Sequence, residues 1–247
     1  MKQLVAYITS GYPDKSFTTD LALALGENGV DSLELGVPFS DPVADGPLIE
    51  KASHKALELG LKFSDILDIS KEVAPKIDTL WMGYFNSFYQ QDMKKLLPLA
   101  KEIGVSGMII PDLPHEEALL YKDIFSNAGV SNISFVAPTD SDERIKEVVS
   151  EAQKFIYMVA YTGITGSGQA EDLQPFLASI KKHTQTPVYV GFGVNEKTAQ
   201  EKIKGADGVI VGSAFIDILL KEQLSHSQKI EQCSTLAKNI KEKINSL

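Results

Sequence analysis

Residues 32–47 read SLELGVPFSDPVADGP, a short apolar run followed by a polar loop that contains several prolines. Similar apolar runs recur along the whole chain. They occupy residues 4–9, 32–37, 79–84, 107–111, 133–137, 155–160, 188–192 and 208–212. Segments of helical period lie between these runs or after the last one, at residues 20–25, 93–103, 116–128, 142–152, 173–183, 195–203 and 230–244. The alternation predicts right-handed βαβ units and a parallel sheet covered on both faces.

Eight strands in such an alternation close into a barrel, so the sequence predicts an α/β fold, a (β/α)8 TIM barrel, as one domain over residues 1–247. No linker rich in Pro, Gly or Ser divides the chain. A doubly wound open sheet would show the same alternation, but no Gly-x-Gly-x-x-Gly turn follows the first run. The interval between the second and third runs is the longest, so we expect an additional element there.

The composition excludes several classes of protein. Lys and Arg total 24 against 33 Asp and Glu, which gives a formal net charge of -9. Because no stretch gathers basic residues, nucleic acid is not an expected partner. No apolar run approaches the roughly 20 residues of a membrane helix, and no signal-peptide layout precedes the first run, so we expect a cytoplasmic protein. A single cysteine, Cys233, excludes an internal disulfide.

Glu34 is the most informative polar residue of the predicted strands. Active sites of barrel enzymes lie at the carboxyl ends of the strands and on the loops that follow. In a layer covered on both faces, an unpaired carboxylate is costly or stays protonated to a higher pH. Glu34 is therefore a candidate proton donor and acceptor near neutral pH. The alternative is a structural glutamate paired with a buried Lys or Arg.

The loop after Glu34 carries two further carboxylates, Asp41 and Asp45. Aspartate before Pro or Gly is also a common turn and helix-entry residue, which is the structural alternative for each of them. A strand-end acid and a second acid on a proline-stiffened loop would place two proton-handling groups over one barrel mouth. Glu34 with a loop acid is therefore the candidate catalytic pair.

Glycine-rich turns follow the last three apolar runs. They are residues 163–168 (GITGSG), 191–193 (GFG) and 212–213 (GS), the last of which opens a short helical segment. Backbone N–H groups from such turns and from a helix N-terminus can converge on an anion, and barrels usually bind phosphate in this position. Each cluster alone could be a plain turn, but the three together predict a small phosphorylated ligand.

The sequence lacks the residues that lysine-based or metal-based catalysis would need. The predicted mouth is instead rich in aromatic side chains. No Lys stands within a run or at its carboxyl end, which disfavours a Schiff-base aldolase. The four histidines show no paired ligand spacing, so no metal is expected. Five residues near the mouth suit a flat aromatic substrate, with packing in the barrel core as the alternative: Tyr7, Tyr84, Tyr157, Phe192 and Ile210.

Residues 34–47, ELGVPFSDPVADGP, resemble the signature of tryptophan synthase α subunits. Further segments agree in the same order: 9–13 (TSGYP), 82–86 (MGYFN), 111–114 (PDLP), 163–166 (GITG) and 191–194 (GFGV). The resemblance covers essentially the whole chain. It implies a lyase of tryptophan biosynthesis that cleaves indole-3-glycerol phosphate to indole and glyceraldehyde 3-phosphate, with no cofactor in this chain.

The resemblance also implies a role for each site residue. Glu34 would protonate C3 of the indole and then take the glycerol hydroxyl proton, while Asp45 would accept the indole N1–H and stabilise the cationic intermediate. Tyr157 would lie near Glu34, and Thr165 would hold the loop acid when a lid closes. The phosphate would be bound by Gly166, Gly193, Gly212 and Ser213. The indole would lie among Tyr7, Phe192 and Ile210.

A partner follows from the same resemblance. The family works as an α2β2 heterotetramer in which indole passes to a β subunit that holds pyridoxal phosphate, and loops 38–44, 86–91 and 111–115 are the candidate contact surface. Two other functions stay open, namely another phosphate-binding barrel isomerase or epimerase, and a non-catalytic barrel that activates a partner subunit. Against the second, a scaffold has no reason to retain a buried carboxylate that costs stability.

Overall fold

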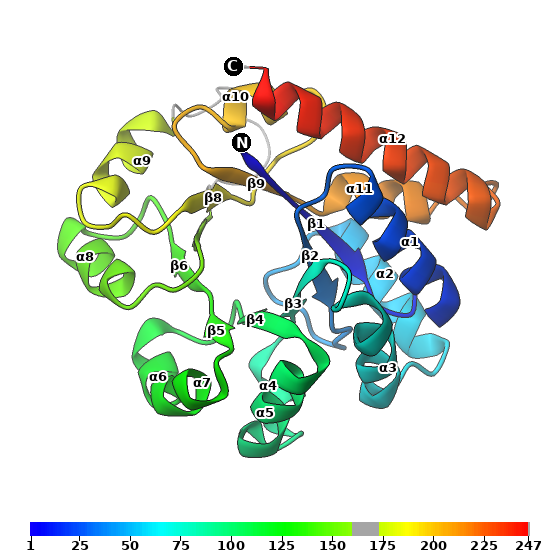
Figure 1. Ribbon diagram of the computed structural model, residues 1–247, viewed down its shortest axis with the longest axis horizontal. Coiled ribbons are helices and arrows are strands. Elements are labelled where there is room, and N and C mark those ends of the chain that lie inside the picture. Colours follow the sequence, from blue (N-terminus) through cyan, green and yellow to red (C-terminus); the bar gives the residue numbers. More distant parts are fainter. Residues whose placement is uncertain (160–172, 247) are drawn as a thin grey trace.

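The computed structural model describes residues 1–159 and 173–246. A ring of short parallel strands occupies its centre, and helices surround the ring (Figure 1). The strands are β1 (Gln3–Thr9), β2 (Ser32–Gly36), β3 (Asp78–Met82), β4 (Val105–Ile109), β5 (Ser131–Asn132), β6 (Ser134–Val136), β7 (Ile156–Met158), β8 (Val188–Val190) and β9 (Gly208–Val211). Their order in the sheet is β5-β4-β3-β2-β1-β9-β8-β7-β6, and all paired neighbours are parallel.

The two ends of this sheet are successive pieces of one strand. We expected a single run over residues 133–137, but the strand is divided into β5 and β6 at Ile133. β5 pairs with β4 and β6 pairs with β7, so the strand changes partners at this residue. The backbone N–H of Ile133 still donates to the carbonyl of Met108 at 2.9 Å. The ring is thereby nearly closed, and the predicted (β/α)8 barrel is confirmed.

The helices lie outside the ring and mostly follow the predicted segments. They are α1 (Lys15–Glu27), α2 (Pro47–Glu58), α3 (Phe63–Val73), α4 (Phe85–Tyr89), α5 (Met93–Ile103), α6 (His115–Leu119), α7 (Lys122–Ala128), α8 (Asp142–Ser150), α9 (Gln174–Lys181), α10 (Ala199–Lys202), α11 (Ser213–Leu219) and α12 (His226–Asn245). The additional element expected in the longest interval is real, because this interval contains two helices, α2 and α3. α2 packs against β1 and α11.

The prediction of one continuous helix over residues 116–128 is wrong. The segment 116–128 forms two helices, α6 and α7, instead of one. Tyr121 lies between them and packs its ring against Phe85 of α4, with ring centroids 5.2 Å apart. This contact joins the loop after β4 to the loop after β3, which is a tertiary interaction that helical periodicity does not report.

The inner wall of the barrel carries its own small core. The interior cluster consists of Val5, Leu80, Ile109, Ile133, Phe155, Tyr189 and Ile210, with Met82, Phe135 and Tyr157 packed against it. Glycines at inward positions make room for the larger rings of neighbouring strands. A Cβ on Gly191 would lie 2.1 Å from Cε1 of Tyr157, and a Cβ on Gly36 would lie 2.4 Å from the hydroxyl oxygen of Tyr7. Tyrosine and glycine are therefore matched across adjacent strands.

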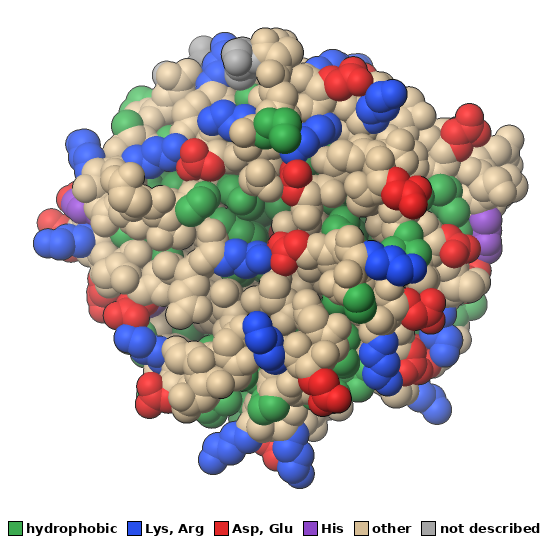
Figure 2. Space-filling view, viewed as in Figure 1, with side chains coloured by type: hydrophobic (Ala, Val, Ile, Leu, Met, Phe, Trp, Pro, Cys, Tyr) green, Lys and Arg blue, Asp and Glu red, His purple; other side chains and the backbone are tan. Residues whose placement is uncertain are grey.

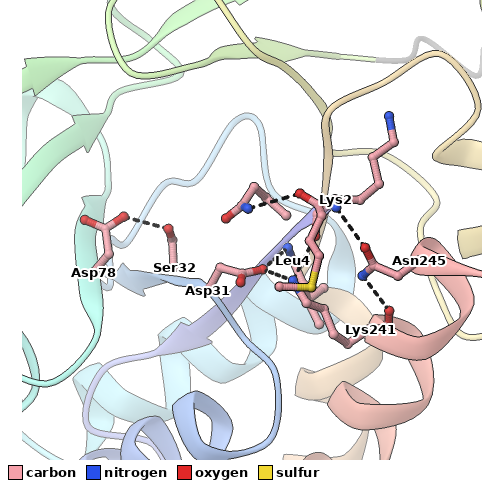
Figure 3. A network of polar contacts seen from close by, with 9 residues as sticks. Lys2, Leu4, Asp31, Ser32, Asp78, Lys241 and Asn245 are labelled. Carbon is pink, nitrogen blue, oxygen red and sulfur yellow. Dashed lines mark hydrogen bonds and ion pairs between the residues drawn. The ribbon is translucent and has the colours of Figure 1, made fainter.

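Polar contacts tie the last helix to the amino end of the barrel (Figure 3). The carboxylate of Asp31 accepts hydrogen bonds from the backbone N–H of Leu4 at 2.7 Å and from Nζ of Lys241 on α12. Nζ of Lys241 also donates to the carbonyl of Lys2 at 2.8 Å. The side-chain oxygen of Asn245 accepts from the backbone N–H of Lys2 at 2.9 Å. This end of the barrel is thus joined to the carboxyl-terminal helix.

The charged side chains on the face shown in Figure 2 are of both signs and lie interspersed. No large area of that face carries one sign of charge, which agrees with the absence of a basic stretch in the sequence. Each helix among residues 1–159 and 173–246 is too short or too polar to cross a lipid bilayer.

Candidate active site

Glu34 lies on β2 and is almost completely buried, with 2% of its surface exposed. Its backbone is paired with Tyr7 of β1 on one side and with Leu80 of β3 on the other. Among the described residues, its Oε1 atom has no hydrogen-bond partner. The structural alternative, a glutamate paired with a buried Lys or Arg, is therefore not found in the described part of the chain. Burial, together with the nearby charge of Asp45, raises the pKa of the Glu34 carboxyl to about 8.

Asp45 is the second acid of the site. It lies half-buried in the loop between β2 and α2, and burial raises the pKa of its carboxyl to about 6, although a hydrogen bond with Tyr84 opposes the rise. The other loop acid, Asp41, is exposed and accepts a hydrogen bond from the neighbouring Ser40 hydroxyl. The two loop acids therefore differ in their environments. Of the two, Asp45 is the one whose charge raises the pKa of the Glu34 carboxyl.

Tyr84 holds the loop that carries Asp45. Its hydroxyl accepts a hydrogen bond from the backbone N–H of Ala44 at 2.9 Å and also bonds to the Asp45 side chain. Its ring stacks on Phe39 of the same loop, with centroids 5.2 Å apart. The sequence indicated Tyr84 only as one aromatic residue near the mouth. Its position directly after Gly83, at the carboxyl end of β3, is the signal that it faces the loop.

Two further tyrosines point into the barrel beside the acids. Tyr7 lies on β1 and Tyr157 on β7, where Tyr157 stacks on Phe135 with centroids 5.0 Å apart. Burial is the largest cause that raises the pKa of both hydroxyls far above the ordinary value, and the carboxylates of Glu34 and Asp45 add to it. Both hydroxyls therefore stay protonated and are available as hydrogen-bond donors.

The apolar side chains of the site line the barrel interior and one part of its rim. Ile210 is buried within the interior cluster, and Met82, Ile109 and Phe135 stand beside it. No motif in the sequence distinguishes these last three residues as part of the site, although they occupy alternate, inward positions of their strands. Phe192 follows β8 and is 44% exposed, so it lies at the rim. Met82 and Ile109 are in register with Gly36, so the barrel mouth has an apolar wall near the two carboxyl groups and an exposed aromatic ring at its rim.

The glycine turns are placed at the ends of β8 and β9. Gly193 has a φ of +66°, and a Cβ there would meet no described atom within 4 Å. Gly212 precedes α11, and a Cβ on it would lie 3.4 Å from Cβ of Tyr7. Ser213, the first residue of α11, is exposed. Gly212 and Ser213 follow β9, the neighbour of β1, and Gly193 follows β8, the next strand of the ring.

Two predicted site residues, Thr165 and Gly166, belong to the segment 160–172 and lie outside the described residues. In the described part of the chain, His, Cys, Asp and Glu side chains form no group of three or more that could hold a metal ion. The arrangement that remains is a pair of carboxyl groups with raised pKa values, an apolar wall formed by the interior cluster, and an open glycine turn at the end of β8. It is suited to moving protons on a flat apolar ring that bears an anionic tail.

Comparisons with known proteins agree with this geometry. The family model of the tryptophan synthase alpha chain matches residues 1–245. The tryptophan synthase alpha chain of Wolinella succinogenes is 53% identical over 247 residues, which cover 100% of this chain and 97% of that protein. The corresponding chain of Thermoanaerobacter sp. strain X514 is 38% identical, with 98% and 93% covered.

Solved structures show the same likeness. The tryptophan synthase alpha chain of Legionella pneumophila superposes with a TM-score of 0.89 at 30% identity, and the match covers 100% of this chain and 94% of that one. A chain of tryptophan synthase from M. tuberculosis, in an open form with BRD0059 bound, superposes with a TM-score of 0.88 at 27% identity, with 98% and 92% covered.

Proposed function

The chain belongs to the tryptophan synthase alpha chain family, and from this membership we propose which of its residues carry out the family's reaction. That reaction is a lyase step of tryptophan biosynthesis, the cleavage of indole-3-glycerol phosphate to indole and glyceraldehyde 3-phosphate. One observation carries the assignment. The Oε1 atom of the buried Glu34 carboxyl group has no partner among the described residues, and the charge of Asp45 acts on this group.

The chemistry requires an acid and a base on one ring. The carbon–carbon bond cannot leave its electrons on an intact aromatic indole, so C3 must first be protonated. Glu34, whose pKa is raised to about 8, holds a proton at neutral pH and is the group that donates it to C3. The Glu34 carboxylate then takes the proton of the glycerol hydroxyl. The bond to C3 breaks, its electrons restore the indole, and the hydroxyl carbon becomes the aldehyde.

Asp45 stabilises the positive charge that protonation of the ring creates. Protonation of C3 places positive charge on the ring, centred on N1. Asp45, with a pKa of about 6, is ionised at neutral pH and accepts the N1–H, which stabilises the cation. The two carboxyl groups therefore hold opposite protonation states between about pH 6 and pH 8. Tyr157 lies beside Glu34, and Thr165 supports the loop acid.

The remaining residues bind the substrate. Tyr7, Phe192 and Ile210 surround the indole, and the apolar packing of Met82, Ile109 and Phe135 in the cluster that contains Ile210 supports that placement. Gly166, Gly193, Gly212 and Ser213 bind the phosphate through backbone N–H groups. The open turn at Gly193 and the exposed first residue of α11 support this assignment. Both proton transfers come from side chains, so the chain needs no cofactor of its own for this step.

The family membership also implies a tryptophan synthase β subunit as partner. We assign the contact surface to the mouth-side loops 38–44, 86–91 and 111–115. Exposed apolar side chains support this choice, because Val43 is 84% and Tyr89 is 58% exposed. An α2β2 assembly, pyridoxal phosphate in the β subunit and a cytoplasmic location are the corresponding proposals for the complex. An isomerase, an epimerase or a non-catalytic barrel is not favoured by the comparisons.

Indole release from indole-3-glycerol phosphate tests the assignment, measured on the chain alone and with a cognate β subunit. We expect release by the chain alone, a faster rate in the complex and co-elution in gel filtration. Glu34→Gln should bind the phosphate-bearing substrate but lose turnover. Near-normal turnover in Glu34→Gln would refute the role of this residue. Unchanged mobility and rate on adding the β subunit would refute the partner surface.

A further inference from the structure

Two polar groups in the barrel interior each lack one hydrogen-bond partner among the described residues. Oε1 of Glu34 has no partner among the described residues. The hydroxyl oxygen of Tyr7 receives a long hydrogen bond of 3.5 Å from Thr9, but no described residue accepts the proton of Tyr7 itself. One group is an acceptor that lacks a donor, and the other is a donor that lacks an acceptor. Both are buried, where an unmade hydrogen bond is costly.

The two groups belong to neighbouring inward positions. Tyr7 and Glu34 are paired in the register of β1 and β2. The Tyr7 ring leans across to β2, because its hydroxyl oxygen lies 2.4 Å from where a Cβ on Gly36 would stand. Gly36 is the next inward residue after Glu34, and two residues of a strand span only about 6.6 Å. The Tyr7 hydroxyl is therefore within reach of a glutamate side chain rising from position 34.

We propose that Tyr7 is a positioning residue whose hydroxyl donates a hydrogen bond to the Glu34 carboxylate after the Glu34 proton has passed to the substrate. This inference rests on the proposed role of Glu34 as the acid. In the resting enzyme the carboxyl group is protonated, and an oxygen without a donor costs less there than on a carboxylate. Once ionised in a buried site, it requires one, and the hydroxyl supplies it until the glycerol proton restores the acid.

Other groups around Glu34 do not take over this role. Asp45, whose charge acts on Glu34, and the exposed Glu50, whose charge acts on Asp45, are acceptors when ionised, so neither can donate to the carboxylate. The Tyr84 hydroxyl is engaged by Ala44 and Asp45, and the hydroxyl of Thr9 is directed to Tyr7. Tyr157 approaches Glu34 from β7, on the opposite side of the ring, but its hydroxyl already has the carbonyl of Gly191 as an acceptor at 3.5 Å. Tyr7 is the tyrosine in register with Glu34.

The test is Tyr7→Phe, which keeps the ring and removes one oxygen atom. Loss of a hydrogen bond to a charged group should lower kcat about tenfold or more, with KM changed less than about twofold. Because the hydrogen bond favours the ionised form, its loss should raise the pKa of Glu34 and move the basic limb of the pH–rate profile up by about one unit. NMR titration with carboxyl-labelled glutamate measures the same shift without turnover.

Tyr189→Phe is the matched control, because Tyr189 is another buried tyrosine of the interior cluster, stacked on Phe155 with centroids 4.4 Å apart. It should leave kcat, KM and the basic limb unchanged. An unchanged kcat in Tyr7→Phe would overturn the proposal. So would a lower kcat with an unmoved basic limb, because the hydroxyl would then act on the substrate and not through Glu34. Retained turnover in Glu34→Gln would instead refute the assignment of the acid itself.

Discussion

The Tyr84 hydroxyl accepts a 2.9 Å hydrogen bond from the backbone N–H of Ala44, the residue before Asp45. This bond joins the end of β3 to the loop after β2, and it places the loop acid over the barrel mouth. The same hydroxyl bonds to the Asp45 side chain and lowers the pKa of its carboxyl against the effect of burial. The position and the protonation of the proposed base thus depend on one phenol group.

Tyr84→Phe should therefore change both properties at once. Loss of the hydrogen bond raises the pKa of Asp45, so the acidic limb of the pH–rate profile should move to higher pH. With the loop less well held, kcat/KM should fall about tenfold, which corresponds to the loss of one hydrogen bond to a charged group. Steady-state kinetics between pH 5 and 9 check this. An acidic limb at the wild-type position would show that Tyr84 does not act on Asp45.

The wild-type enzyme should show a bell-shaped pH dependence of kcat/KM. Asp45 must be ionised, so activity falls as the pH drops through about 6, and Glu34 must be protonated, so activity falls as the pH rises through about 8. Asp45→Asn should lose most of its activity, and its residual rate should lack the acidic limb. A profile that keeps rising above pH 9 would be incompatible with Glu34 as the acid.

Glu34→Gln should stabilise the fold while it abolishes turnover. Folding raises the pKa of this carboxyl from 4.5 to about 8, so its contribution to stability is lost as the pH rises towards 8. The variant and the wild type should have similar free energies of unfolding below pH 4.5. At pH 8 the variant should be more stable by about 2–4 kcal/mol. Urea unfolding at several pH values measures the difference, and a variant less stable than wild type at pH 8 would contradict it.

Gly191→Ala should test the matching of glycine and tyrosine inside the barrel. The added Cβ would lie 2.1 Å from the Tyr157 ring, so the ring must move away from its place beside Glu34. We expect a loss of about 1–3 kcal/mol of stability and a lower kcat. Gly46→Ala is the control for stability, because a Cβ there meets no described atom within 4 Å. Equal thermal unfolding of the two variants would argue against close packing at Gly191.

Lys241→Met should loosen the amino end of the barrel. The Lys241–Asp31 pair is largely shielded, with side chains 17% and 29% exposed, and the variant leaves Asp31 without its cation. The expected loss is about 1–3 kcal/mol. Lys71→Met breaks an exposed pair with Asp68, whose side chains are 56% and 63% exposed, and should cost less than about 1 kcal/mol. Denaturant unfolding compares the two, and equal losses would show that shielding does not matter here.

The barrel and its acid pair could be predicted because both depend on local patterns. A parallel strand covered on both faces is an uninterrupted apolar run, so Glu34 stands out within one, and a loop with several prolines marks Asp45. The long interval between the second and third runs likewise predicted an additional element, which is the pair α2 and α3. Each of these features can be recognised from residues that are neighbours in the sequence.

The positions that were missed depend on contacts between distant segments. Helical periodicity continues through Tyr121, but its contact with Phe85 accompanies the break between α6 and α7. The change of partners at Ile133 arises where one strand must pair with β4 and then with β7 to close the ring. No pattern within either segment reports on a partner that lies elsewhere in the chain.

The sequence by itself determined the architecture, the two candidate carboxyl groups and the glycine turns after β8 and β9, since periodicity, prolines and glycines act on the backbone where they stand. Only the tertiary structure decided what each carboxyl group faces. Ala44 meets a hydroxyl 40 residues away in the sequence, and Tyr7 comes into register with Glu34 because β1 and β2 are neighbours in the ring. The side chains around Glu34 bury its carboxyl group and place charges near it, and together they set its pKa.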